Sequence, residues 1–247
     1  MIVNEVREQE KRKIKSKKII QMKKLQFTNY TIDFDSTVMT RYGEQEGAKR
    51  GRASHYPLMA FITDCNMMAN MWLRSGVSSS SGNFHGFVEE TLERLKEKKV
   101  GLVRLDSGFY AKQILSLLEE KKMNYLVSVP LYAPIQRKLA EQTNWLKLSE
   151  GVEVALSEYQ AIDWGSLWKI VMIRQTIAER PKATGKQLRL FKNTDLYQRY
   201  RFSSLVTNIN LPHAELWRMY RHRAEAENKI KELKYDFGFD SFNLRSF

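Results

Sequence analysis

The sequence predicts an α/β fold: a mixed sheet flanked by helices, with a β-rich insertion before the last helix. Three observations predict it. An early segment alternates polar and apolar residues, the middle alternates helices with short apolar strands, and several strand-like runs precede a long C-terminal helix. The chain has 247 residues, of which 43% are hydrophobic, so it can bury one sizeable core.

The first elements are predicted to be three successive strands of an antiparallel sheet. Polar and apolar residues alternate over 30–35, which places Asp33 and Asp35 on the same side of the first strand. Apolar runs at 57–65 and 68–74 predict the next two strands. The periodicity does not separate Asp33 from Asp35 as a functional acid.

Two helices and two buried strands are predicted next. Their expected positions are about 84–98 (helix), 100–105 (strand), about 111–122 (helix) and 125–129 (strand). Asp106 follows the first of these strands directly. Because ligand sites in α/β sheets favour strand ends, Asp35 and Asp106 are both candidates for a functional site.

A β-rich insertion is predicted at about 130–210. It contains a short helix near 134–141 and strand-like runs at 152–159, 167–177 and 201–209. The polar, basic stretch 180–193 is expected to be a hairpin tip or a flexible excursion. Pro212 then lies where a proline is favoured, in the first turn of the last helix.

The last helix concentrates its functional-looking side chains on one face. At helical phase, four residues share an arc of about 60°: Tyr220, Arg223, Glu227 and Lys234. An adjoining apolar stripe is expected to pack on the sheet: Met219, Ala226, Ile230 and Leu233. The other charged residues point toward water, where they can pair along the helix. Glu227 is thereby distinguished from Glu225 and Glu232.

The charge of the chain favours a polyanionic partner. The formal net charge is +13, from 41 Lys and Arg against 28 Asp and Glu, which makes nucleic acid the leading candidate. Residues 1–24 form a basic N-terminal arm, and a glycine-containing loop carries Lys49, Arg50 and Arg52. The arm can equally contact phosphate or be a solvated charge run. The loop can also contact phosphate, but a flexible solvated loop is favoured over that interpretation.

Cysteine and histidine usage excludes two kinds of site. The single Cys65 cannot form an internal disulfide, and four scattered histidines without a cysteine partner do not make a zinc site. Any metal is therefore expected to have oxygen ligands. No apolar run approaches about 20 residues and the N-terminus is polar, so we expect a soluble intracellular protein.

Several stretches resemble the DDE transposases of bacterial insertion sequences that carry a Y-R-E-K signature. The spacing of Tyr220, Arg223, Glu227 and Lys234 matches that signature. Further blocks look like successive parts of the family: D-F-D-S-T-V, G-E-Q-E-G-A, K-R-G-R-A-S-H-Y-P-L, W-L-R-S-G and R-L-D-S-G-F. The resemblance extends from about residue 30 to the C-terminus.

The resemblance implies a ribonuclease-H-like catalytic domain over residues 25–247. It implies that Asp35, Asp106 and Glu227 are the catalytic, metal-binding triad, with Asp35 favoured over Asp33. Two Mg²⁺ ions, for which Mn²⁺ can substitute, would lie about 4 Å apart and assist nucleophile and leaving group. The implied reaction is cleavage of DNA at transposon ends, followed by strand transfer into target DNA.

The same resemblance suggests DNA contacts and an assembly. Tyr220, Arg223 and Lys234 are expected to contact the DNA backbone, and Trp164 or Trp168 is either a platform for an extruded base or a core residue. The partner is double-stranded DNA, bound by a dimer in the synaptic complex, in the bacterial cytoplasm with the nucleoid.

Family members usually have more chain at both ends, so we expect a fragment. Two alternatives stay open: a non-catalytic DNA-binding remnant of a transposase, and a ribonuclease-H-like nuclease.

Overall fold

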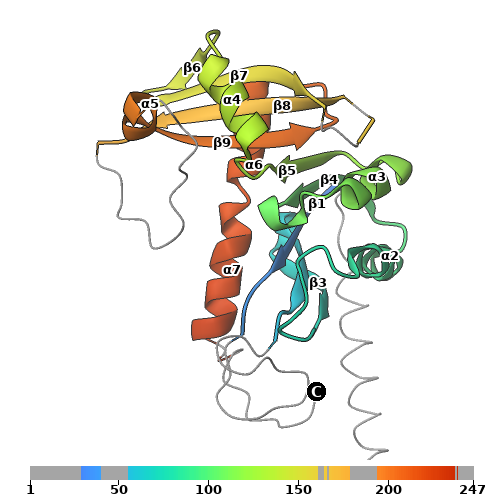
Figure 1. The fold of residues 1–247 in the computed structure, drawn as a ribbon. Helices are drawn as coiled ribbons and strands as arrows, with labels where there is room; N and C mark the ends of the chain where they lie inside the picture. The colour runs from blue at the N-terminus through green and yellow to red at the C-terminus, as the bar shows by residue number, and fades with distance from the viewer. Residues whose placement is uncertain are drawn as a thin grey trace, which may run out of the picture.

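A computed structural model of the chain describes residues 29–39, 55–160, 164–165, 167–178, 194–236 and 238. These residues form one mixed sheet of nine strands in the order β3-β2-β1-β4-β5-β9-β8-β7-β6 (Figure 1). The strands are β1 (Asn29–Ser36), β2 (Leu58–Ile62), β3 (Met67–Trp72), β4 (Lys99–Leu105), β5 (Tyr125–Ser128), β6 (Leu146–Ser149), β7 (Val152–Tyr159), β8 (Trp168–Thr176) and β9 (Tyr200–Thr207). Strands β1, β4 and β5 are parallel, and every other neighbouring pair is antiparallel.

Six α-helices accompany this sheet in the part of the chain that the structure describes: α2 (Phe84–Leu95), α3 (Lys112–Glu120), α4 (Ala133–Glu141), α5 (Thr194–Arg199), α6 (His213–Arg221) and α7 (Ala224–Tyr235). Figure 1 shows α2 and α3 on one side of the sheet and α7 on the other. The predicted α/β fold, a mixed sheet flanked by helices, is confirmed. The sequence patterns missed β6, a short exposed edge strand, and α5, which is too short to show periodicity.

The two faces of β1 face different parts of the interior. Tyr30, Ile32 and Phe34 are buried in the main hydrophobic cluster with α2 and α3, and the rings of Phe34 and Phe84 meet edge to face at 5.1 Å. On the opposite face, Met59 and Phe61 of β2 pack against Ala226 and Ile230 of α7. This second cluster holds α7 over the face of the sheet that carries Asp33 and Asp35.

The strands of the predicted insertion continue the same sheet. β9 pairs with β5 through Leu126 and Thr207 and with β8 along the whole length of β9. Trp168 is buried in the main cluster, and Trp164 packs against it at 5.0 Å. This packing agrees with the core interpretation of Trp168. The basic arm 1–24, the loop with Lys49, Arg50 and Arg52, and the stretch 180–193 lie outside the described residues.

The predicted long C-terminal helix is in fact two helices. α6 ends at Arg221 and α7 begins at Ala224, although His222 and Arg223 keep right-handed helical backbone angles. At the junction, the Arg223 N–H donates to the Tyr220 carbonyl at 2.9 Å, and the Ala226 N–H donates to the Arg223 carbonyl at 3.0 Å. These bonds span three residues, as in a 3₁₀ helix, so the junction is wound more tightly than a straight α-helix.

Candidate active site

Asp35 is the penultimate residue of β1 and is only 5% exposed. Its two carboxylate oxygens have different partners. Oδ1 accepts a hydrogen bond of 2.7 Å from the Ser36 N–H, and Oδ2 lies 2.8 Å from an Arg223 guanidinium nitrogen. The carboxylate is therefore fixed by its own strand on one side and by the α6–α7 junction on the other.

Arg223 connects Asp35 with Glu227. Its side chain is buried, and Nη1 donates to the Glu227 carboxylate at 3.3 Å while Nη2 also reaches the Phe34 carbonyl at 3.4 Å. The Glu227 side chain is 59% exposed, so it lies at the surface end of this arrangement. A single guanidinium thus joins acids from the first strand and the last helix.

Asp106 follows β4 directly, as the sequence indicated. Its Oδ1 accepts a hydrogen bond of 2.8 Å from the Gly108 N–H and caps the short 3₁₀ turn Ser107–Phe109. A side chain at position 108 would collide with this arrangement, because a Cβ atom there would meet the Ser80 hydroxyl at 2.7 Å and Asp106 Oδ1 at 3.1 Å. Gly108 therefore lets the turn close against Asp106.

The charges of the three acids act on one another. Burial raises the pKa of the Asp35 carboxyl to about 6; Arg223 opposes this shift, and the negative charges of Asp106 and Glu227 add to it. Burial lowers the pKa of Arg223, but nearby Asp35, Tyr220 and Asp106 outweigh burial and raise it overall. The three carboxylates therefore carry more negative charge than Arg223 offsets.

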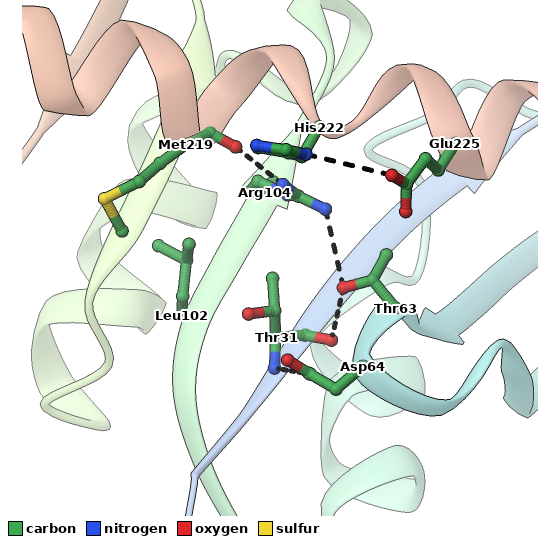
Figure 2. Close-up of a pocket in the computed structure, with 8 residues that line it drawn as sticks. All are labelled: Thr31, Thr63, Asp64, Leu102, Arg104, Met219, His222 and Glu225. Carbon is green, nitrogen blue, oxygen red and sulfur yellow. Dashed lines mark hydrogen bonds and ion pairs between the residues drawn. The ribbon is translucent and has the colours of Figure 1, made fainter.

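Asp33 has a separate partner. The Arg104 guanidinium donates to both of its carboxylate oxygens, at 2.6 and 2.8 Å, and both side chains are buried. Burial raises the pKa of Asp33, and Arg104 opposes that shift. Arg104 also donates to the Met219 carbonyl at 2.6 Å, which ties the end of α6 to β4 (Figure 2). The structure thereby distinguishes Asp33 from Asp35, which periodicity alone could not do.

A cavity of about 290 Å³ opens beside this ion pair, on the side of the junction shown in Figure 2. Thr63 accepts a long hydrogen bond from Arg104 at 3.4 Å, and Asp64 accepts one from the Thr31 N–H at 2.6 Å. Across the cavity, the His222 ring lies 3.8 Å from the Glu225 carboxylate. These polar side chains of the cavity lining thus have partners within the chain, and Arg104 forms its ion pair with Asp33.

The remaining signature residues hold the helices to the strand ends. The Tyr220 hydroxyl donates to the Leu105 carbonyl at 3.2 Å, next to Asp106, and burial raises its pKa. Lys234 Nζ donates to the Val38 carbonyl at 2.9 Å, in the segment that follows Asp35. Tyr220 therefore lies next to Asp106, Lys234 lies against the segment that follows Asp35, and both donate to backbone carbonyls of this chain.

A second cavity, of about 430 Å³, adjoins Glu227 between β8, β9 and the α6–α7 junction. Its lining includes Gln175, Arg201 and Trp217, whose participation the sequence did not indicate. The Trp217 ring is stacked on Tyr220 at 6.5 Å with an interplanar angle of 19°. Trp217 lies on α6, three residues before Tyr220, whereas Gln175 and Arg201 come from β8 and β9, whose position only the folded sheet defines.

The donor chemistry of the cluster fits a hard divalent cation, because all three acids offer oxygen. The Arg223 guanidinium forms ion pairs with both Asp35 and Glu227. Among the described residues, no three His, Cys, Asp or Glu side chains converge closely enough to hold a metal ion. Asp35, Asp106 and Glu227 are nevertheless close enough that the charges of Asp106 and Glu227 act on Asp35. Their role as metal ligands stays a prediction.

The fold is a mixed sheet with flanking helices, and Asp35, Asp106 and Glu227 come from its first strand, from the end of β4 and from the last helix. The chain belongs to the family described as Transposase DDE domain group 1, whose sequence model matches residues 4–247.

Among solved structures, the chain is similar to piggyBac transposase in a synaptic complex with hairpin DNA, with 10% sequence identity and a TM-score of 0.47. The match covers 84% of this chain and 41% of that one, so this chain spans less than half of that transposase. No curated protein matches the chain. None of the helices in the described ranges is long and apolar enough to cross a membrane.

Proposed function

We propose that this DDE transposase domain cleaves DNA phosphodiester bonds at transposon ends and transfers the cut strands into target DNA. The observation that carries the proposal is the linkage Asp35–Arg223–Glu227, which brings the last helix to the edge of the sheet where Asp106 follows β4. Membership in the family supports the reaction class. The spacing of Tyr220, Arg223, Glu227 and Lys234 is the basis for proposing that the transposase belongs to a bacterial insertion sequence.

Asp35, Asp106 and Glu227 are the proposed ligands of Mg²⁺, or of Mn²⁺ in its place. When bound, such an ion would supply Lewis-acid stabilisation of phosphate charge and would lower the pKa of an attacking hydroxyl. The chain itself supplies the positioning. Asp35 is held in a buried setting, and the contacts of Tyr220 and Lys234 fix α6 and α7 against the ends of β4 and β1.

Double-stranded DNA is the proposed partner, bound through its phosphates. The net charge of +13 favours such binding. The proposed contacts are Tyr220, Arg223 and Lys234 beside the acids, together with Lys49, Arg50 and Arg52 in the loop outside the described residues. A dimer that pairs two DNA ends and a location with the bacterial nucleoid belong to the same proposal.

The test is a cleavage assay with DNA that carries candidate element ends, in Mg²⁺, comparing the wild type with Asp106→Asn. We expect the substitution to abolish nicking, because it removes a charged oxygen ligand and leaves the side-chain shape nearly unchanged. Asp195→Asn, at an exposed site on α5, is the matched control and should nick DNA like the wild type.

Each of the other outcomes points elsewhere. Nicking that survives Asp106→Asn would remove Asp106 from the proposed triad. DNA binding without any nicking by the wild type would favour a non-catalytic remnant. Cleavage without strand transfer would favour a ribonuclease-H-like nuclease.

A further inference from the structure

Arg223 is buried at the centre of the acidic cluster. Only 4% of it is exposed, and its guanidinium spans the Asp35 carboxylate at 2.8 Å and the Glu227 carboxylate at 3.3 Å. The tight α6–α7 junction holds its backbone, because the Arg223 N–H is bonded to Tyr220 and its carbonyl to Ala226. A buried cation so placed has a large electrostatic effect on both acids.

The oxygen that Arg223 contacts on Asp35 is the one that accepts no backbone hydrogen bond. Oδ1 of Asp35 is engaged by the Ser36 N–H, which leaves Oδ2, and Oδ2 is the atom that lies against Arg223. On Glu227, the guanidinium contacts Oε1. A divalent cation and a guanidinium at the same oxygens repel one another across a short distance, most strongly at the buried Asp35, so their occupancies oppose each other.

We propose that Arg223 is a positioning residue that acts as an internal counter-cation: it holds Asp35 and Glu227 together and competes with a divalent cation for them. The inference rests on the proposed function, since it takes the two acids as metal ligands. Beyond that function, it states that the Arg223 guanidinium is displaced from the two carboxylates when a metal ion binds. Thermodynamic linkage then requires that removing this cation tighten metal binding.

The test measures Mn²⁺ affinity by isothermal titration calorimetry on the whole chain, after treatment with a chelator. Arg223→Met removes the charge and keeps the length of the side chain. We expect it to bind Mn²⁺ roughly tenfold more tightly than the wild type. The matched control is Arg218→Met on α6, which makes the same change of charge at a side chain that is 54% exposed. The control should bind like the wild type.

Affinity of Arg223→Met equal to or weaker than that of the wild type would overturn the inference. Thermal unfolding gives a second readout: with chelator, Arg223→Met should melt below the wild type, and Mn²⁺ should raise its Tm by more. If Arg223→Met does not fold, Arg223→Lys replaces it. A single ammonium cannot span both carboxylates as the planar guanidinium does, so this variant should also bind Mn²⁺ more tightly. Unchanged or weaker binding by Arg223→Lys would contradict the inference in the same way.

Asp106→Asn separates this inference from the proposed function. If wild-type Mn²⁺ binding is absent, or is unaffected by Asp106→Asn, the proposed metal site fails and the inference falls with it. If binding depends on Asp106 but is not tightened by Arg223→Met, the inference alone fails.

Discussion

Asp33 and Asp35 lie on the same side of β1, yet their partners differ because β4 ends beside them. The register pairs Asp33 with Arg104 and Phe34 with Leu105, the last residue of β4. Asp33 therefore has a neighbouring strand to supply its cation. Asp35 lies past the end of β4, and its cation, Arg223, comes from the helical junction above the sheet.

Breaking the Asp33–Arg104 pair should be costly. Arg104→Met would leave Asp33 buried without a cation, and we expect the free energy of unfolding to fall by about 3–5 kcal/mol. Urea titration measures this. The double variant Arg104→Met with Asp33→Leu should recover much of the loss. Glu153→Gln, which breaks a more exposed pair with Arg174, should cost less than about 1 kcal/mol. A cost as small for Arg104→Met would contradict the prediction.

The raised pKa of Asp35 predicts a pH dependence of stability. A folded-state pKa of about 6, above the ordinary value of 3.8, means that the folded chain binds this proton more tightly than the unfolded chain. Stability from this group is therefore lost as the pH rises from about 4 to about 6. In chelator, Asp35→Asn should reduce the fall in unfolding free energy across that window.

Urea unfolding at several pH values measures this slope. Asp195→Asn, an exposed substitution, should keep the wild-type slope. An unchanged slope in Asp35→Asn would mean that Asp35 does not titrate with a raised pKa.

The junction of α6 and α7 is the element that completes the site. Arg104 holds the end of α6 through the Met219 carbonyl, and Tyr220 holds it through the Leu105 carbonyl. Ala226 and Ile230 then hold the start of α7 on β2. Between these anchors, the tight turn places Arg223 inside the molecule and leaves Glu227 at the surface.

Loosening α7 should weaken both the fold and the site. Ile230 packs on Met59 and Phe61, so Ile230→Ala should lower the free energy of unfolding by about 2 kcal/mol or more. Lys231→Ala, on the exposed face of α7, should change it by less than about 0.5 kcal/mol. Chemical denaturation measures both variants. Cleavage should also fall in Ile230→Ala, because Glu227 lies on the same helix.

The insertion strands and the early strands belong to one sheet and share one hydrophobic cluster. β9 is bonded to β5 on one side and to β8 on the other, and the main cluster contains side chains from both parts, such as Phe34 and Trp168. Urea unfolding followed by tryptophan fluorescence and by far-ultraviolet circular dichroism should therefore give coincident transitions. Two separate transitions would show that the insertion unfolds independently.

The sequence by itself determined most of the elements and the candidate acids, because those signals are local. The alternation over 30–35 placed Asp33 and Asp35 together on one side of a strand, the strand end placed Asp106, and helical phase selected Glu227. Only the family resemblance favoured Asp35 over Asp33. The same phase argument took α6 and α7 as one helix. It did so because neither glycine nor proline marks the break in the sequence. The break is also slight in the structure, where His222 and Arg223 keep helical backbone angles.

Only the tertiary structure decided which charges meet. Arg104 pairs with Asp33, and Arg223 joins Asp35 to Glu227, through contacts between elements far apart in the chain. Such contacts depend on the register of β4 against β1 and on how the junction turns, and no local pattern encodes either. The burial that raises the pKa of Asp35 likewise arises only in the folded protein. Only the folded protein brings Gln175 and Arg201 to the cavity that Glu227 also lines.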